Sequence, residues 1–241
     1  MLKINKLQKT LTNKEMARLE QLSTPPVCDA MAALGIKKRF FMHASIKPLT
    51  CCKKIVGVAY TVRATEGNSF PVHYAIYQGQ PGYVLIVDTN GFEDGPYMGE
   101  LMVATAQKIG LTGIVVDGYV RDAELIQAMN YPVFGKGFIP NQPDKKQVGE
   151  INGCITCAGV EVNPGDIILG DLDGLVVIPR ELLNTILDAA EQKDTLDLSR
   201  RAKIEEFFKD NLNNMYNKDI SVLMSKDVLN LSVNMKENLE E

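Results

Sequence analysis

The chain has little of what marks several large classes of protein. Its 26 Lys and Arg stand against 30 Asp and Glu, giving a net charge of −4, so no basic surface for nucleic acid is predicted. No apolar run approaches the roughly 18 residues that a membrane span needs. Residues 1–6 lead into polar sequence rather than an apolar segment, so we expect no secretory signal. These absences favour a cytoplasmic protein that binds neither nucleic acid nor membranes.

Cysteine and histidine are also scarce. Five cysteines, an odd number, in 241 residues argue against a disulfide scaffold and favour reduced thiols. Cys154 and Cys157 form a single C-x-x-C without a second pair or a nearby histidine, and we interpret them as structural. The two histidines, His43 and His73, are not brought together by any pattern. We expect a packing role for His73, with a place near a pocket as the alternative.

What the chain does have is the composition and patterning of an α/β protein. Its 45% hydrophobic and 23% charged residues suit a globular domain with a sizeable core. Helices are predicted over residues 13–35 (broken by Pro25-Pro26 and resuming at Asp29), 70–79, 98–109, 121 to just before Tyr131, and 180–208, and strands over 54–63, 83–88, 112–117 and 133–134. Residues 1–12 are expected to be a loose lead-in, 135–150 a loop, and 151–178 short antiparallel strands.

The alternation of strands and helices around residues 83–117 predicts a βαβ unit with parallel strands and a right-handed crossover. We therefore expect a single α/β domain with a mixed central sheet over residues 1–208. Residues 209–241 are rich in Asn, Lys and Glu and are expected to form a partly helical tail.

The most informative stretch follows the strand that ends at Asp117-Gly118. Arg121 and Asp122 come directly after this turn, and ligands of open α/β sheets bind at the carboxyl ends of strands. An arginine offers a fork of donors to a carboxylate, and an aspartate offers a hard oxygen to Mg²⁺ or Mn²⁺. The alternatives are a surface ion pair for Arg121 and a helix N-cap for Asp122.

A second candidate element is the helix that Gly99 opens. Free N–H groups at a helix start bind anions, so the backbone at Leu101 and Met102 is predicted to hold a substrate carboxylate or carbonyl oxygen. Glu100 is predicted to bind a metal-linked water or to orient Arg121, with a favourable acid in the first helical turn as the alternative. Asn68, in a short polar loop, is a candidate pocket amide.

The spacing of these residues resembles a known family. Glu100 is separated by residues 101–120 from Arg121-Asp122, and further matching segments read GVAYTVR (57–63), QPG (80–82), GEIN (149–152), NPGD (163–166) and GDLDGLVVIP (170–179). This ordered set, over roughly residues 20–205, resembles the RraA-like family. That family includes class II pyruvate aldolases acting on 4-hydroxy-4-methyl-2-oxoglutarate and 4-carboxy-4-hydroxy-2-oxoadipate.

The resemblance implies a fold similar to the swivelling domain of phosphohistidine carriers and a homo-oligomer, trimeric or hexameric, with sites between subunits. It implies a small 2-keto acid substrate and cleavage that yields pyruvate, with oxaloacetate decarboxylation as a side activity. Asp122 would hold Mg²⁺ or Mn²⁺, and Arg121, Glu100 and the backbone of Gly99, Leu101 and Met102 would complete the site. A neighbouring subunit would add an acid, Glu191 or Glu205.

A different class of function is also implied. Some RraA-like proteins inhibit the endoribonuclease RNase E by protein–protein contact and need no intact metal site. The presence of both Arg121 and Asp122 favours the enzyme. A methyltransferase is not supported, because no glycine-rich cofactor loop is followed by an acidic strand end.

Overall fold

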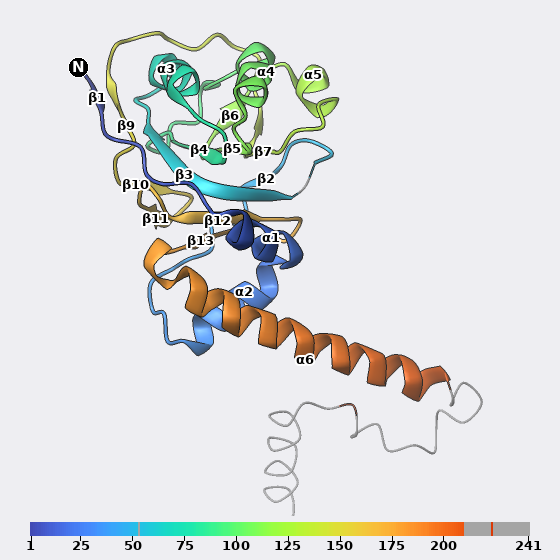
Figure 1. Ribbon diagram of the computed structural model, residues 1–241. Helices are drawn as coiled ribbons and strands as arrows, with labels where there is room; N and C mark the ends of the chain where they lie inside the picture. The colour runs from blue at the N-terminus through green and yellow to red at the C-terminus, as the bar shows by residue number, and fades with distance from the viewer. Residues whose placement is uncertain (53, 210–222, 224–241) are drawn as a thin grey trace, which may run out of the picture. The chain divides into compact units, whose positions relative to one another are not determined.

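The computed structural model describes residues 1–52, 54–209 and 223. The chain divides into two compact units, Met1–Glu191 and Gln192–Glu241, and the first carries the sheet (Figure 1). The predicted tail, residues 209–241, lies outside the described residues except for Lys209 and residue 223. None of the helices in the described part combines the length and the apolar character needed to cross a membrane.

The helices and strands follow each other in the order that the sequence pattern predicts, and the structure contains several further short strands. They are β1 (Leu2–Ile4), α1 (Asn13–Gln21), α2 (Thr24–Ala33), β2 (Lys47–Pro48), β3 (Ile55–Arg63), α3 (Phe70–Gln78), β4 (Tyr83–Asp88), α4 (Glu100–Ile109), β5 (Gly113–Val116), β6 (Tyr119–Val120), α5 (Ala123–Gln127), β7 (Val133–Gly135), β8 (Gly137–Phe138), β9 (Gly149–Ile151), β10 (Ile155–Cys157), β11 (Val160–Val162), β12 (Ile167–Gly170), β13 (Leu175–Ile178), a 3₁₀ turn (Arg180–Leu182) and α6 (Leu183–Lys209).

The central sheet is mixed, as predicted. Its main path runs β1-β9-β3-β4-β5-β7-β2, and β12 and β13 join it beside β3. The middle strands β3, β4, β5 and β7 are parallel to one another. Antiparallel pairing joins β2 to β7, and both β9 and β12 to β3. The parallel strands end at the same edge, so their following loops gather there.

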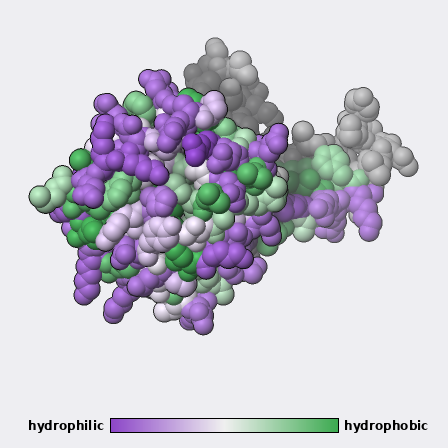
Figure 2. Space-filling view, turned by 90° about the horizontal axis from the view of Figure 1, so that it is seen from above, coloured by the Kyte–Doolittle hydropathy of each residue, from purple (hydrophilic) through white to green (hydrophobic). Residues whose placement is uncertain are grey.

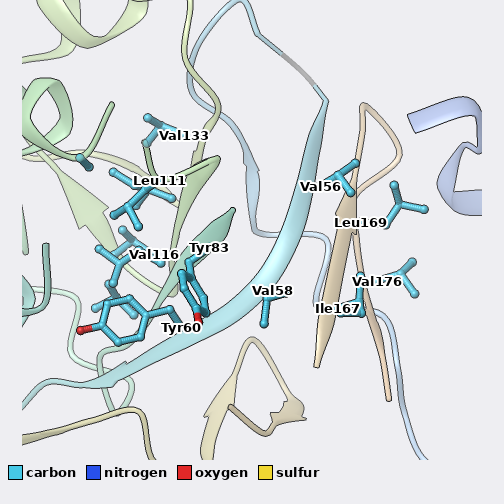
Figure 3. Packing of buried hydrophobic residues seen from close by; sticks show 14 of the residues in the cluster. Val56, Val58, Tyr60, Tyr83, Leu111, Val116, Val133, Ile167, Leu169 and Val176 are labelled. Carbon is cyan, nitrogen blue, oxygen red and sulfur yellow. The ribbon is translucent and has the colours of Figure 1, made fainter. Parts of the chain in front are cut away.

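The two faces of the sheet bury different sets of residues. Val58 and Tyr60 of β3 face the cluster that also contains residues of the helices, whereas Ala59 between them faces the cluster of β10 and β11. This alternation follows from the period of two along a strand. Figure 3 shows the first cluster, in which Tyr60 and Tyr83 lie together; their ring centroids are 5.8 Å apart. In Figure 1, α3, α4 and α5 lie together on one side of β4, β5 and β7.

Local signals explain the helix limits. Thr12 and Glu15 form a capping box at the start of α1: the Thr12 N–H donates to Glu15 Oε2 at 2.8 Å, and Thr12 Oγ1 accepts the Glu15 N–H at 3.3 Å. Gly110 ends α4 in the left-handed conformation, with φ of +97°. The predicted break within residues 13–35 is confirmed, but its position was wrong. The second helix begins at Thr24 rather than Asp29, because prolines fit the first helical turn, where N–H groups have no helical acceptor.

Two other predictions were wrong for a shared reason. Residues 1–12 are not all a loose lead-in, because β1 pairs parallel with β9; and residues 135–150 are not all loop, because β8 and the start of β9 fall within them. These three strands, β1, β8 and β9, are two or three residues long and are formed by pairing between separate parts of the chain. Local periodicity carries no information on such pairing.

Candidate functional site

The site begins with two segments that run side by side. The Tyr97 N–H donates to the Tyr119 carbonyl at 3.0 Å, and the Arg121 N–H donates to the Met98 carbonyl at 3.0 Å. The stretch that enters α4 therefore lies beside β6 and its continuation. This register brings Gly99, at the start of α4, next to the Arg121-Asp122 pair predicted from the sequence.

Asp122 is held in an unusual way. Its backbone is left-handed, with φ 66° and ψ 50°, a conformation that Asp tolerates better than most residues. It stands at the N-cap position of α5, but its side chain makes no capping bond to that helix. Instead, Asp122 Oδ2 accepts the backbone N–H of Glu100 at 3.0 Å. The carboxylate thus caps α4, the neighbouring helix, and the predicted alternative role applies to a different helix than expected.

Gly99 is required by this close approach. A Cβ at position 99 would overlap Asp122 Oδ2 and would lie 3.2 Å from Arg121 Nε. The φ of Gly99 is −128°, so the need for glycine is one of space and not of backbone conformation. Arg121 Nε lies 3.8 Å from Asp122 Oδ2, and both side chains are 39% exposed. The ion pair with Glu124 or Glu100, considered as an alternative for Arg121, is not the contact formed.

These groups open onto a cavity of about 190 Å³. Its walls come from the starts of α3 and α4, from the Arg121-Asp122 pair and from the loop before β9: Ser69, His73, Met98, Gly99, Leu101, Met102, Arg121, Asp122, Gln142, Pro143 and Lys145. A groove of about 170 Å³ between α3 and α4 adjoins it and shares His73, Leu101 and Met102. Five of the seven predicted site residues therefore line one cavity, and the other two are placed differently.

Most backbone N–H groups at the start of α4 already have a hydrogen-bond acceptor. The Glu100 N–H donates to Asp122, and the Met102 N–H lies 3.1 Å from the Gly99 carbonyl. Leu101 is the exception: within the described part of the chain its N–H has no hydrogen-bond acceptor, and its side chain is 78% exposed. A free N–H at a helix N-terminus beside Arg121 suits a carboxylate or carbonyl oxygen, and this binding role stays a prediction.

Glu100 and Asn68 are the two predicted residues outside the cavity wall. Glu100 contributes its backbone N–H, as described, and a role for its carboxylate stays a prediction. Asn68 is fully buried. Its Nδ2 donates to the carbonyls of Lys146 and Val148 at 2.9 and 3.0 Å, and its Oδ1 accepts the N–H groups of Lys146 and Phe70. Its amide holds a loop, so the structure does not support the prediction that Asn68 contacts substrate.

His73 combines both roles considered for it. Its ring packs on Tyr77, with centroids 5.3 Å apart, and the residue also lines the cavity. Burial, together with the positive charge of Lys145, lowers the pKa of His73. The imidazole is therefore neutral at pH 7, and Arg121 and Lys145 are the cationic side chains of the cavity wall.

The residues present fit a magnesium-type ion and do not fit zinc. No group of three or more His, Cys, Asp or Glu side chains suited to a metal is found among the described residues. Asp122 offers one carboxylate whose Oδ1 has no hydrogen-bond or ion-pair partner among the described residues. Mg²⁺ keeps several waters and is commonly held by one or two carboxylates, whereas structural and catalytic zinc sites need three or four protein ligands.

Glu191 and Glu205, the acids predicted to complete the site of a neighbouring subunit, differ in the contacts that they make within their own chain. Arg18 binds Glu191 through two hydrogen bonds of 2.6 and 2.8 Å and binds Asp188 at 2.5 Å. The bonds from Arg18 lower the pKa of Glu191 and hold its carboxylate within its own chain. Glu205, on the later part of α6, is exposed. Of the two acids, Glu205 is the one without an ion pair to another described residue.

Other predicted motifs are structural. The five cysteines are free; Cys157 is buried and Cys154 exposed. Asp171 closes a tight turn by accepting the Asp173 N–H at 3.0 Å, and it also accepts the Thr24 N–H at 2.7 Å at the start of α2. A larger hollow of about 770 Å³ lies near Arg39 and Arg180, but its lining mixes cations with Glu161, Asp166 and Glu181. It contains neither the Arg121-Asp122 pair nor the Leu101 N–H, which meet beside Gly99 at the smaller cavity.

Comparison with known proteins decides the family. The model of the RraA-like family, described as Aldolase/RraA, matches residues 24–177. The chain is an RraA-like protein. The match spans both halves of the site, since it includes Gly99 and the Arg121-Asp122 pair, and it confirms the resemblance seen in the sequence motifs.

Relatives of this RraA-like chain include proteins named as aldolases and proteins named as RraA inhibitors. It is 33% identical over 197 residues (81% of the chain, 92% of the relative) to a protein of Halalkalibacterium halodurans named "Putative 4-hydroxy-4-methyl-2-oxoglutarate aldolase". Among solved structures, RraAS2 of Streptomyces coelicolor, from the RNase ES inhibitor RraA family, has a TM-score of 0.70 at 25% identity, covering 80% of this chain and 98% of that one. The RNA-processing inhibitor RraA of Thermus thermophilis has a TM-score of 0.58 at 25% identity, covering 64% and 92%.

Proposed function

We propose that this RraA-like chain is a divalent-metal-dependent lyase that cleaves a 4-hydroxy-2-keto acid and releases pyruvate. The observation that carries the proposal is the meeting of Arg121, the Asp122 carboxylate and the free Leu101 N–H at one cavity. A guanidinium and a helix N-terminus bind an anion, and a hard carboxylate oxygen binds a cation beside it. The aldolase name of the Halalkalibacterium relative supports the same chemistry.

The chain's own residues would bind and orient the keto-acid end. Arg121 donates to the carboxylate of the substrate, and the Leu101 N–H donates to a second oxygen of the same group. A base takes the proton of the 4-hydroxyl; the C3–C4 bond then breaks, its electron pair passes to C3 and the 2-keto group, and C4 becomes a carbonyl. Protonation of the resulting enolate at C3 gives pyruvate. Mg²⁺ or Mn²⁺ held by Asp122 would supply Lewis-acid stabilisation of the charge that develops at the 2-keto oxygen.

Oxaloacetate decarboxylation belongs to the same proposal. Loss of CO₂ from oxaloacetate leaves the same pyruvate enolate, so the groups that stabilise one reaction stabilise the other. Glu100, together with an acid from a neighbouring subunit, is retained as a predicted proton-handling group.

We also propose that the chain acts as a homo-oligomer, a trimer or hexamer. Tyr77 on α3 and Leu101 on α4, which line the groove beside the cavity, are 60% and 78% exposed, and Leu125 on α5 is 59% exposed. Figure 2, seen from above, looks onto this helical side, where hydrophobic groups lie among hydrophilic ones. Exposed apolar side chains next to a site favour burial against another subunit. Light scattering of the purified chain measures the oligomeric state directly.

The first experiment is a pyruvate-release assay over a panel of 4-hydroxy-2-keto acids and oxaloacetate. EDTA is expected to abolish release, and Mg²⁺ or Mn²⁺ to restore it, because a single carboxylate holds such an ion with modest affinity. Full activity after exhaustive chelation would contradict the metal dependence. No pyruvate from any acid, with metal present, would instead favour an inhibitor of RNase E. The solved relatives are named as an RNA-processing inhibitor and as a member of an RNase ES inhibitor family.

A further inference from the structure

Three short segments of the chain run together toward the rim of the cavity. They are the entry loop (residues 93–98, which lead into α4), the rim segment (residues 117–122, which carry Arg121 and Asp122) and the return segment (residues 136–141, which follow β7). Backbone hydrogen bonds join the rim segment to each of the other two, so it lies between them. The place of α4 relative to Arg121 therefore depends on how these segments are aligned.

The backbone pairing between the segments is short. The entry loop and the rim segment share the two bonds described above. On the other side, β6 and β8 pair over two residues each, the Lys136 N–H donates to the Gly118 carbonyl at 2.8 Å, and the Ile139 N–H donates to the Val120 carbonyl at 2.9 Å. Strand pairs of this length have little stability of their own. Side chains that connect the segments therefore contribute to their alignment.

One side chain connects all three segments. Lys136 begins the return segment, and its ammonium binds Glu93 of the entry loop at 2.8 Å and Asp117 of the rim segment at 3.2 Å. The side chains of Lys136 and Asp117 are 16% and 14% exposed. Asp117 is fixed further, because its Oδ2 accepts the Ala158 N–H at 2.6 Å. The ammonium therefore holds the entry loop, through Glu93, to a carboxylate that is itself anchored.

The charges around this ammonium explain why its removal would shift the entry loop. Without it, two carboxylates remain close together, and Asp117 has little contact with water to screen its charge. Asp117 is anchored, whereas Glu93 is 56% exposed and lies on a loop, so Glu93 is the group that moves. Because the entry loop leads into α4, this movement would displace the Leu101 N–H from Arg121.

We propose that Lys136 is a positioning residue for the cavity. Its ammonium sets the position of the Leu101 N–H relative to the Arg121 guanidinium by tying the entry loop to the rim segment. Lys136 is not among the residues that line the cavity, so it acts through the backbone of the two segments and not on a ligand. The inference rests on the proposed function for what the cavity binds, and the alignment of the segments is tested separately.

Amide hydrogen exchange of the full chain measures this alignment directly. Lys136→Met removes the ammonium and retains an apolar side chain of similar length. The amides of Tyr97 and Arg121, which donate the bonds between the entry loop and the rim segment, should then exchange about tenfold faster than in the unmodified chain, because local opening becomes easier. Lys136→Arg keeps a cation between the two carboxylates and should restore slow exchange.

Arg63→Met is the matched control. Arg63 also binds two acids of the sheet, Asp88 at 3.7 Å and Glu150 at 3.1 Å, but these acids lie outside the three segments. Its loss should leave the exchange of the Tyr97 and Arg121 amides unchanged. A general loss of stability would instead speed the exchange of β4 and β5.

Calorimetry with pyruvate and Mg²⁺ adds a readout that a purely structural role would not change. Misaligned donors weaken binding to every molecule and raise Kd, whereas a fraction of inactive protein lowers the number of binding sites at constant Kd. Lys136→Met should raise Kd about tenfold with unchanged stoichiometry, as for the weakening of one charge-assisted contact. Lys136→Arg should restore the Kd of the unmodified chain, and Arg63→Met should retain it.

The outcomes separate this inference from the proposed function. Unchanged exchange of Tyr97 and Arg121 in Lys136→Met, or an equal increase in Arg63→Met, would overturn the positioning role. A Kd for pyruvate that stays constant while the number of sites falls would also overturn it. Faster exchange and weaker binding in Lys136→Met alone would support it. If the unmodified chain neither binds nor releases pyruvate, the proposed function fails, and the exchange result then decides the role of Lys136 by itself.

Discussion

The strands beneath the site and the rim of the cavity differ in the interactions that hold their residues in place. Residues of β4 and β5 such as Leu85 and Ile114 are completely buried and are held by many apolar neighbours. At the rim, Arg121 and Asp122 are 39% exposed and are held by a few directed contacts: one backbone bond from Glu100, one to Met98 and the space left by Gly99. Stability therefore resides in the strands, and the proposed chemistry resides at the rim. A substitution in one region should leave the property of the other largely intact.

Arg121→Lys is expected to show the largest difference between its effect on activity and its effect on stability. An ammonium cannot reproduce the two-pronged hydrogen bonding of a guanidinium to a carboxylate, so kcat/KM for pyruvate release should fall roughly 10² to 10³-fold, as for loss of one preorganised donor. The free energy of unfolding should change by less than about 1 kcal/mol, because the side chain is partly exposed. Steady-state kinetics and denaturant unfolding on the same sample measure both. Near-normal kcat/KM would show that the role given to Arg121 is wrong.

Ile114→Ala tests the other side of the comparison. Ile114 is fully buried in β5, and removing its side chain leaves a cavity, so the free energy of unfolding should fall by about 2 to 5 kcal/mol. Activity per folded molecule should remain within about twofold at temperatures below the transition. If this variant lost activity as severely as Arg121→Lys while still folded, the strands and the rim would not be separable.

Asp166 is expected to make the free energy of unfolding depend on pH, a smaller effect that concerns stability and not activity. Burial raises the pKa of this carboxyl to about 6, against 3.8 for an unperturbed aspartate. Because the folded state binds the proton more tightly, the unfolded state releases it first as pH rises, and stability falls between about pH 4 and pH 6. The loss should be about 1 to 3 kcal/mol. Asp166→Asn should flatten this part of the curve, measured by unfolding at each pH, and an unchanged slope would contradict it.

Much of the sheet could be predicted from sequence because its strands are continuous apolar runs. β4 and β5 are bounded by turn residues and joined by an amphipathic helix, so their existence, type and parallel pairing follow from local pattern. β1, β8 and β9 could not be found this way. They are two or three residues long and exist because distant segments pair with one another.

The site was predictable in its residues but not in its contacts. The spacing of Gly99, Glu100, Arg121 and Asp122 in the sequence indicated that they share one location. The structure brings them together because residues 97–99 pair with residues 119–121. That Asp122 caps α4 and not α5 depends on a left-handed backbone that no sequence pattern announces. The hydrogen bonds from Asn68 to the carbonyls of Lys146 and Val148 were missed, because these partners lie 78 and 80 positions away in the sequence.

Asp122→Ala provides the most direct test of the central claim, that a rim carboxylate serves the chemistry and hardly the fold. Pyruvate release with Mg²⁺ and inhibition of RNase E should be measured on the unmodified chain and the variant from matched preparations. We expect the unmodified chain to release pyruvate, and the variant to lose more than about 100-fold of that activity while losing only about 1 kcal/mol of stability with the α4 cap. An Asp122→Ala variant that keeps metal-dependent turnover would contradict the account. So would a result in which the unmodified chain and the variant inhibit the ribonuclease equally and neither releases pyruvate.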